Sequence, residues 1–455
     1  MKKHTFEIKN LLFLSLPLIF SNLINAATSL ITMFLLSKIN SDALAAGAII
    51  TSTYGLIVMI VISMLYSVSI MVAKYHGANQ PQEIGAIVFA GIIITLLAGF
   101  PFTVMMLYIT PIFELLGQPH QISILAGEYF HGIAFGLLPS LIGAVFMQFF
   151  MGSSKTKFIL YLTLFGVMIN SILSYLFIFG SGFIPSMKMF GGGLAGAVTA
   201  WILLIVTLVF IKTSPAFSRY RIFTRDALKL KYLPILLKIG APISIQYSAE
   251  ILSFSILTYL MGLIGTRALA AQQIALQCSM ISIMIVMAIS QSGSILVSQA
   301  VGQNNLPATL KIGQSALFFG TVLMLFIGIL YWFFPLNLIS LYLDVHNPAL
   351  QPTINLAKII LSITAFTQIF DSGRNIAAGL LRGFGDTKSS LKTGIVSCWI
   401  IGIPAAITLG FVLHLGAAGV RLGIMFGIFF GCINLILRFY TWNRKIPNVK
   451  LAYAK

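Results

Sequence analysis

Long apolar runs recur along the whole chain and are separated by short polar segments. Each run is long enough to supply the roughly 20 helical residues that cross a bilayer core about 30 Å thick. The runs predict twelve helices, at residues 11–36, 46–73, 86–109, 122–150, 158–182, 190–213, 234–262, 269–300, 310–334, 352–381, 389–413 and 416–442. This pattern predicts an all-α integral membrane protein in which no segment is left for a soluble domain.

The second half of the chain repeats motifs of the first half in the same order. Pro17 and Pro242 lie 225 positions apart, as do the segments SDALAAGAI (Ser41–Ile49) and TRALAAQQI (Thr266–Ile274). Three more matches follow at offsets of 225, 231 and 223: Val72–Gln80 with Val297–Asn305, Met151–Lys157 with Arg382–Lys388, and Gly193–Val198 with Gly416–Arg421. Ordered matches at nearly one offset indicate an internal duplication.

Each half holds six predicted helices, so both halves should enter the membrane from the same side. We expect an N-terminal lobe at residues 1–213, a short basic cytoplasmic linker at 214–233, and a C-terminal lobe at 234–455. Two lobes with the same orientation are related by an axis along the membrane normal, as in transporters built from parallel repeats.

The composition and the placement of basic residues support this topology. Of the residues, 58% are hydrophobic and 8% are charged, whereas soluble domains carry about 25% charged residues. The net charge is +18, and 22 of the 28 Lys and Arg residues fall on one side of the predicted spans. This is the positive-inside bias, which predicts that both termini are cytoplasmic. The basic excess then concerns orientation and anionic lipid head groups rather than nucleic acid.

Motifs of catalysis are missing from the sequence. No HExxH, GxSxG or P-loop pattern is present, and Cys278, Cys398 and Cys432 all fall inside predicted helices without metal-ligand spacing. We therefore expect neither an enzyme, nor a pump driven directly by nucleotide, nor a bound cofactor.

Acidic residues inside the predicted spans are the main candidates for function, because ionisable groups are expensive in a bilayer. Three lie there: Glu128, Glu250 and Asp371. The repeat counterparts of Glu250 and Asp371 are Asn25 and Ser140, so these carboxylates belong to the second half alone. Two desolvated carboxylates on neighbouring helices can share a proton, because their repulsion raises one pKa, or they can supply oxygen ligands to a small cation.

Polar neighbours would complete such a site. Gln246 lies one turn before Glu250 on the same helix face, with Tyr247 next to it, and Gln273 and Gln277 lie one turn apart on the eighth predicted helix. These residues are predicted to support the site or to line a substrate cavity.

Two charged residues allow a second interpretation. Arg374 follows Asp371 by three residues, so the two can form an ion pair that only fixes the tenth helix. A working relay is favoured over this structural role, because Glu250 has no basic partner within its own span. Glu128 lies near the outer end of the fourth helix, three residues before His131, where a structural or mouth-lining role is favoured over coupling.

Several motifs together resemble one transporter family. They are the paired ALAA segments, the glycine loops after helices two and eight, the GLLRGFGDTK stretch at 379–388, and the two carboxylates. The chain resembles the multidrug and toxic compound extrusion (MATE) transporters, and looks closest to their NorM-like bacterial branch. The resemblance spans the chain from about Leu14 to Arg438.

The resemblance implies two six-helix lobes around a V-shaped central cavity, and export of bulky, often cationic drugs in exchange for sodium ions or protons. Glu250 and Asp371 match the family's cation site in the second lobe. Gln273 falls where the branch has a polar residue on helix eight. Many members also carry an aspartate in helix one, where this chain has Thr32. Coupling is then expected to rest on the second lobe, which favours sodium over protons.

Three functions follow as hypotheses. The first is secondary active efflux of amphipathic organic cations from the cell, through the inner membrane, by a monomer that alternates its access and exchanges the drug for Na+ or H+. The second is a flippase for a lipid-linked saccharide or a related amphiphile, although few basic residues lie in the spans: Lys358, Arg374 and Arg421. The third is a passive channel or facilitator.

Overall fold

The computed structural model describes residues 2–182, 184–224, 228 and 230–445, with residues 2–7 and 445 described by their backbone alone. Within these residues, twelve helices are long and apolar enough to cross a membrane, which confirms the predicted all-α fold with twelve spans. Parts of the predicted linker (225–227 and 229) and of the predicted C-terminal lobe (446–455) lie outside the described residues.

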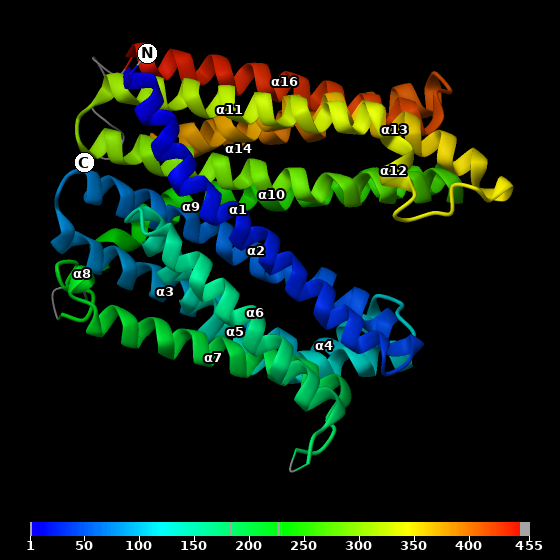
Figure 1. The fold of residues 1–455 in the computed structure, drawn as a ribbon, viewed down its shortest axis with the longest axis horizontal. Coiled ribbons are helices and arrows are strands. Elements are labelled where there is room, and N and C mark those ends of the chain that lie inside the picture. The colour runs from blue at the N-terminus through cyan, green and yellow to red at the C-terminus, as the bar shows by residue number, and fades with distance from the viewer. Residues whose placement is uncertain (1, 183, 225–227, 229, 446–455) are drawn as a thin grey trace. The chain divides into compact units, whose positions relative to one another are not determined.

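Eleven of the spans are single helices, and one is interrupted (Figure 1). The single helices are α1 (Lys2–Ser37), α2 (Ser41–Gly77), α3 (Ile84–Leu107), α5 (His120–Gly152), α6 (Thr156–Phe179), α7 (Lys188–Thr213), α9 (Leu233–Ile264), α10 (Thr266–Gly302), α11 (Leu306–Phe333), α13 (Gln351–Gly383) and α16 (Gly416–Lys445). Three short helices lie in the connections: α4 (Ile109–Leu115), α8 (Pro215–Ser218) and α12 (Pro335–Ile339).

The eleventh span departs from the single helix predicted at 389–413. It consists of α14 (Thr387–Ile395), a π-helical segment (Val396–Gly402), α15 (Ile403–Ile407) and a second π-helical segment (Thr408–Val412). Pro404 lies in the first turn of α15 and has no backbone N–H to donate. A missing donor leaves one carbonyl of the preceding turn without its helical partner, and a π-type turn is one local change that accommodates this.

Helix ends also extend beyond the apolar runs. The second span was predicted to start at residue 46, but α2 begins at Ser41, because the Asn40 side chain accepts a hydrogen bond from the Ala43 N–H at 2.7 Å. Such a cap satisfies an amide that the first turn leaves unpaired. Polar first turns of this kind are invisible to a search for apolar residues.

The contacts divide the chain into two compact units. Unit 1 comprises Met1–Leu16 and Ile245–Lys455, and unit 2 comprises Pro17–Ser244. The lobes expected from the sequence, 1–213 and 234–455, stay a prediction, because the units are cut within α1 and α9 rather than in the loops.

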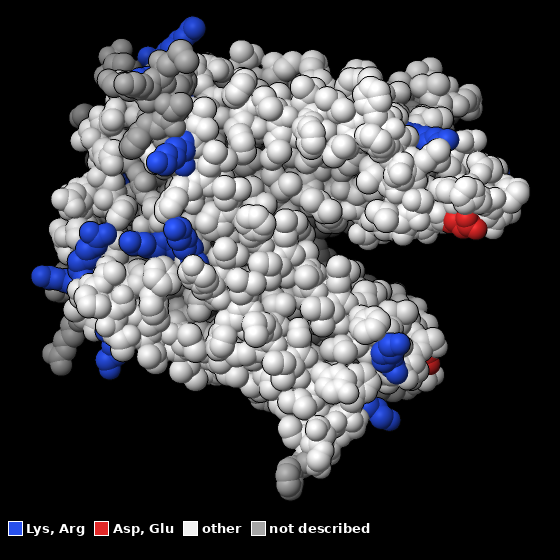
Figure 2. All heavy atoms as spheres, viewed as in Figure 1, with Lys and Arg blue, Asp and Glu red and all other residues white. Residues whose placement is uncertain are grey.

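Each unit is built around one helix. In unit 2, α5 packs against α2, α3 and α7, and in unit 1, α13 packs against α10, α11 and α16 (Figure 1). These central helices are the fourth and the tenth spans, which hold the same place in the two halves of the repeat. On the face shown in Figure 2, the charged side chains lie toward the ends of the helices, and the middle of that face shows none.

Close approach of the central helix to a neighbour depends on small residues. A methyl group added at Gly136 of α5 would lie 2.3 Å from the Cα of Ala197 on α7, whereas one added at Gly143, two turns later on α5, would meet no atom within 4 Å. The backbones of α5 and α7 therefore touch at Gly136, as is typical of membrane helix pairs.

This difference gives a matched pair of substitutions. We expect Gly136→Ala to destabilise the protein, by about 1–3 kcal/mol for overpacking, and to lower its melting temperature in detergent by several degrees. Gly143→Ala should leave the melting temperature unchanged or raise it, because alanine is the better helix former. Equal melting temperatures for the two variants would contradict the packing described for α5 and α7.

Candidate functional site

The two predicted carboxylates lie on helices that meet inside unit 1. Glu250 lies near the middle of α9, and Asp371 lies on α13, one turn before Arg374. Because α13 is the central helix of the unit, its polar groups are shielded on several sides. The side chains of Arg374, Glu250 and Asp371 are only 4%, 10% and 17% exposed.

Arg374 lies between the two carboxylates and donates hydrogen bonds to both. Its Nη1 is 2.7 Å from Glu250 Oε1, and its Nη2 is 3.4 Å from Glu250 Oε2. Its Nε and Nη2 lie 3.1 and 2.8 Å from Asp371 Oδ1. The spacing of three residues had suggested the pairing with Asp371. The contact with Glu250 was not foreseen, since it joins residues 124 positions apart.

Gln246 completes the surroundings of Glu250. Its Nε2 donates to Glu250 Oε1 at 3.0 Å, as the one-turn spacing predicted. The residue is 1% exposed, and its Oε1 has no hydrogen-bond partner among the described residues. A buried acceptor without a donor costs free energy, so this oxygen is available to a further group.

A second buried arginine lines the same small cavity as Asp371. Arg421 of α16 and Asp371 line a cavity of about 30 Å³ together with Gln368, Thr367 and Ser279. Arg421 is buried, and its Nε lies 3.2 Å from Thr364 Oγ1. A smaller cavity, of about 10 Å³, lies against Glu250, Arg374 and Cys398. The first of these spaces has the size that one or two water molecules need.

The charges in this group balance. Two carboxylates, Glu250 and Asp371, pair with Arg374, and a second guanidinium group, that of Arg421, lines the small cavity next to Asp371. Burying charges is tolerable only when each is paired and hydrogen-bonded. In this arrangement the carboxylates have little negative charge to spare for an added cation.

Neighbouring helices leave room for the Arg374 side chain. A methyl group added at Gly431 of α16 would lie 3.0 Å from Arg374 Cδ, and the same position faces Ser397 of the first π-helical segment. Trp399 of that segment donates its indole N–H to the Ala249 carbonyl at 3.1 Å, next to Glu250. The interrupted span therefore contacts α9 beside Glu250.

Tyr247 is engaged by another buried arginine. Arg382 Nη1 donates to the Tyr247 hydroxyl at 2.9 Å, and the guanidinium carbon lies 5.0 Å from the centre of the ring, in cation–π geometry. The predicted tenth helix ends at residue 381, whereas α13 continues to Gly383, so Arg382 lies in its last turn and is 3% exposed.

The other predicted residues lie apart from the carboxylates. Gln273 and Gln277 are exposed on α10 and donate no hydrogen bond to Glu250 or Asp371 in the described part of the chain, whereas Gln272 is fully buried. Glu128 is exposed on α5, and Thr32 is half-buried on α1, both within unit 2. In the described residues, no three His, Cys, Asp or Glu side chains are placed to hold a metal ion together.

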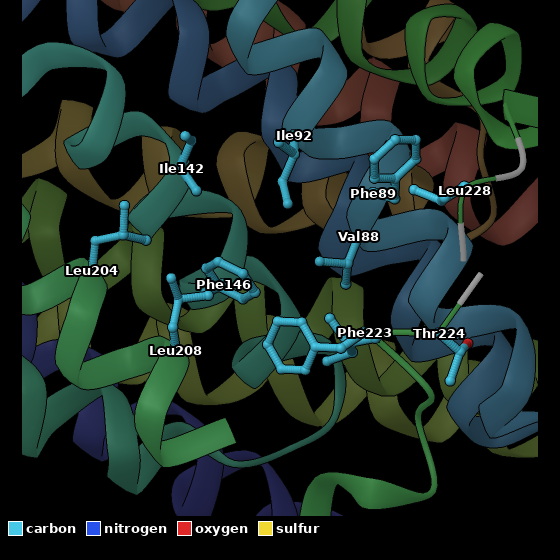
Figure 3. A pocket seen from close by; sticks show the side chains of 11 residues that line it. Val88, Phe89, Ile92, Ile142, Phe146, Leu204, Leu208, Phe223, Thr224 and Leu228 are labelled. Carbon is cyan, nitrogen blue, oxygen red and sulfur yellow. The ribbon is translucent and has the colours of Figure 1, made fainter. Parts of the chain in front are cut away.

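A larger cavity in unit 2 has different chemistry. It holds about 460 Å³ and lies between α3, α5, α7 and four residues of the connection that follows, Ile222, Phe223, Thr224 and Leu228 (Figure 3). Its lining is apolar except for Thr224. Ligand pockets usually add a few polar groups that fix orientation, and this one offers no charged group for an ion.

Comparison with known proteins shows what the chain is similar to. The MatE family model matches residues 17–176 and again residues 242–408, and the two matches start 225 positions apart, as the repeat does. A probable multidrug resistance protein NorM of Synechocystis sp. is 29% identical over 439 residues, which cover 95% of this chain and 94% of the relative. The multidrug resistance protein NorM of Burkholderia vietnamiensis is 30% identical over 429 residues, covering 94% and 92%.

A solved structure shares the fold. It is the outward-facing conformation of a multidrug resistance MATE family transporter of the MOP superfamily, with a TM-score of 0.88 over 97% of each chain and 17% sequence identity.

The bridging position of Arg374 predicts a large effect on stability. Arg374→Met would leave two buried carboxylates without their shared partner, at a cost of about 3–5 kcal/mol, and should lower the melting temperature in detergent. Adding Glu250→Gln to this variant should recover part of the loss, because one of the unpaired charges is removed.

A matched control exists in the same unit. Arg438 pairs with Asp386 at 3.2 Å, but its side chain is 47% exposed. Exposed pairs contribute about 0–1 kcal/mol, so Arg438→Met should change little. An equally small effect of Arg374→Met would contradict the bridging role.

Proposed function

Because the chain belongs to the MatE family and has twelve helices that can span a membrane, we propose that it is a secondary active multidrug efflux transporter. Its substrates are amphipathic organic cations, which it exports by alternating access in exchange for sodium ions or protons. It works as a monomer in the cell inner membrane with both termini in the cytoplasm, and it needs no cofactor beyond the coupling ion.

One observation carries the proposal. Two carboxylates that are nearly buried in one unit share a single guanidinium group between them. Charged groups are retained inside membrane spans where they serve ion or substrate pathways. Uptake of a cation at Glu250 or Asp371 has to rearrange this balanced group, and a rearrangement that depends on the ion is what coupling requires.

The relatives support the choice of substrate. Two of them are named as a probable multidrug resistance protein and a multidrug resistance protein, and the similarity to this chain covers nearly their full length. Export of varied drugs suits a protein whose specificity comes from broad apolar contacts rather than from fixed polar ones.

A flippase for a phosphate-bearing amphiphile is the second candidate. Arg382 has two nitrogens without a hydrogen-bond partner in the described part of the chain, although the residue is buried. Guanidinium groups recognise phosphate well. Binding of a lipid pyrophosphate in preference to a cationic dye would favour this candidate over the drug exporter.

Flux measurements test the proposal. Purified protein is reconstituted into liposomes, and ethidium movement is followed under an imposed sodium gradient and then under a pH gradient. Dye movement against its own gradient under either condition supports exchange and excludes a passive channel, and the driving gradient identifies the ion. No movement under both conditions would rule out a coupled exporter of this cation.

The carboxylates provide the corresponding variants. We expect Glu250→Gln and Asp371→Asn each to lower gradient-driven ethidium flux at least tenfold, while the yield of folded protein in size-exclusion chromatography is retained. We expect the loss because a neutral amide cannot attract the coupling ion as a carboxylate does. Asp344→Asn, in the exposed connection between α12 and α13, is the control and should transport normally. Normal flux in both site variants would disprove the role of the carboxylates.

A further inference from the structure

Arg374 occupies the space that a coupling cation would need at Glu250. Its Nη1 and Nη2 face the two oxygens of the Glu250 carboxylate, at 2.7 and 3.4 Å. A sodium ion bound to the same carboxylate would have to approach those oxygens. The ion and the guanidinium group would then compete for one anionic partner.

Charge reinforces the competition. Glu250, Asp371, Arg374 and Arg421 already sum to zero in this buried group. An added cation that left Arg374 in place would lie against a positive charge in a poorly screened interior. The ion is therefore accepted at Glu250 only if the guanidinium group moves away.

The neighbouring amide is suited to hold the ion. Gln246 is 1% exposed, its Nε2 touches Glu250 Oε1, and its Oε1 has no hydrogen-bond partner among the residues described. Sodium prefers oxygen ligands, and the Glu250 carboxylate and Gln246 Oε1 would supply three. Rotation of the amide by half a turn would bring that oxygen toward the carboxylate. The two groups of oxygen atoms would repel each other there unless a cation lay between them.

Arg374 can leave Glu250 without losing its other partner. It donates through Nε and Nη2 to Asp371 Oδ1, on the same helix one turn earlier. Its displacement would thus break its own bonds to Glu250 of α9, while Arg382 of α13 would still donate to Tyr247 of α9. The ion pair within α13 would keep the arginine close enough to return.

We propose that Arg374 is a tethered counter-cation that competes with sodium for Glu250. Binding of one sodium ion to Glu250 and Gln246 Oε1 breaks the Arg374 bridge between α9 and α13, and departure of the ion lets the guanidinium group form that bridge again. The proposal rests on the proposed function, since it explains how that site takes up and expels its ion.

Sodium binding to the full chain in detergent tests this directly. Equilibrium binding of 22Na+ is measured for the unchanged protein, Arg374→Gln and Arg438→Gln, with potassium as the competing-ion control. Removal of the competing guanidinium group should tighten sodium binding at least tenfold in Arg374→Gln. Arg438→Gln removes an arginine from a carboxylate elsewhere in unit 1 and should stay within twofold of the unchanged protein.

Two second substitutions locate the ion. Glu250→Gln added to Arg374→Gln should abolish the sodium binding, and Gln246→Leu added to it should weaken the binding several-fold. If Arg374→Gln does not yield folded protein, Arg374→Lys is used. Lysine keeps the charge but lacks the fork that spans both carboxylates, so its sodium affinity should lie above that of the unchanged protein.

Melting curves give an independent readout. Because a ligand stabilises the state that binds it, raising sodium in place of potassium should raise the melting temperature of Arg374→Gln more than that of the unchanged protein. A purely structural ion pair would be lost in Arg374→Gln without any gain in sodium affinity.

The outcomes separate this inference from the proposed function. Sodium affinity that is unchanged in Arg374→Gln, or binding that is undetectable in every variant, overturns the inference even if dye flux is driven by an ion gradient. Tighter sodium binding in Arg374→Gln supports it even if ethidium is not transported, in which case the drug-export proposal alone fails.

Discussion

The buried group formed by Glu250, Arg374 and Asp371 is the constraint around which unit 1 is arranged. Charges of this kind survive inside a membrane protein only when they are paired and hydrogen-bonded. Their pairing requires that α9 and α13 approach at one level, and that α16 leave space for the Arg374 side chain at Gly431. The interrupted eleventh span adds a contact beside the same place, through Trp399 and the Ala249 carbonyl. The contacts between these four spans and the buried ion pairs thus lie in the same part of the unit.

The two halves of the chain share the packing of a central helix but differ in their buried charged groups. In both units a single helix, α5 or α13, packs most extensively against three long helices. Only α13 carries a buried ion pair, because Glu128 of α5 is exposed and the repeat counterparts of the site carboxylates are Asn25 and Ser140. After duplication, the fold could be kept by small residues at the helix contacts while the ionisable groups were retained or gained in one half.

The sequence was sufficient for the spans and insufficient for contacts between them. Apolar runs located all twelve helices, since the bilayer sets their length and composition, and helical spacing correctly brought Gln246 to Glu250 and Arg374 to Asp371. The bond from Arg374 to Glu250 depends on how two distant helices are rotated and cannot be read from spacing. The same rotation buries Gln272 while Gln273 is exposed. The predicted tenth helix stopped one residue short of Arg382, because a polar last turn does not resemble a membrane span.

Reverse coupling tests the central claim, that drug and ion are exchanged through the Glu250 group, most directly. Liposomes containing the protein would start with equal sodium and equal pH on both sides, and an ethidium gradient alone would be imposed while 22Na+ and internal pH are recorded. Exchange is thermodynamically reciprocal, so the account predicts that the dye drives sodium or protons in the opposite direction, and that Glu250→Gln stops this movement. Ethidium that equilibrates through the protein while neither ion moves would contradict the account.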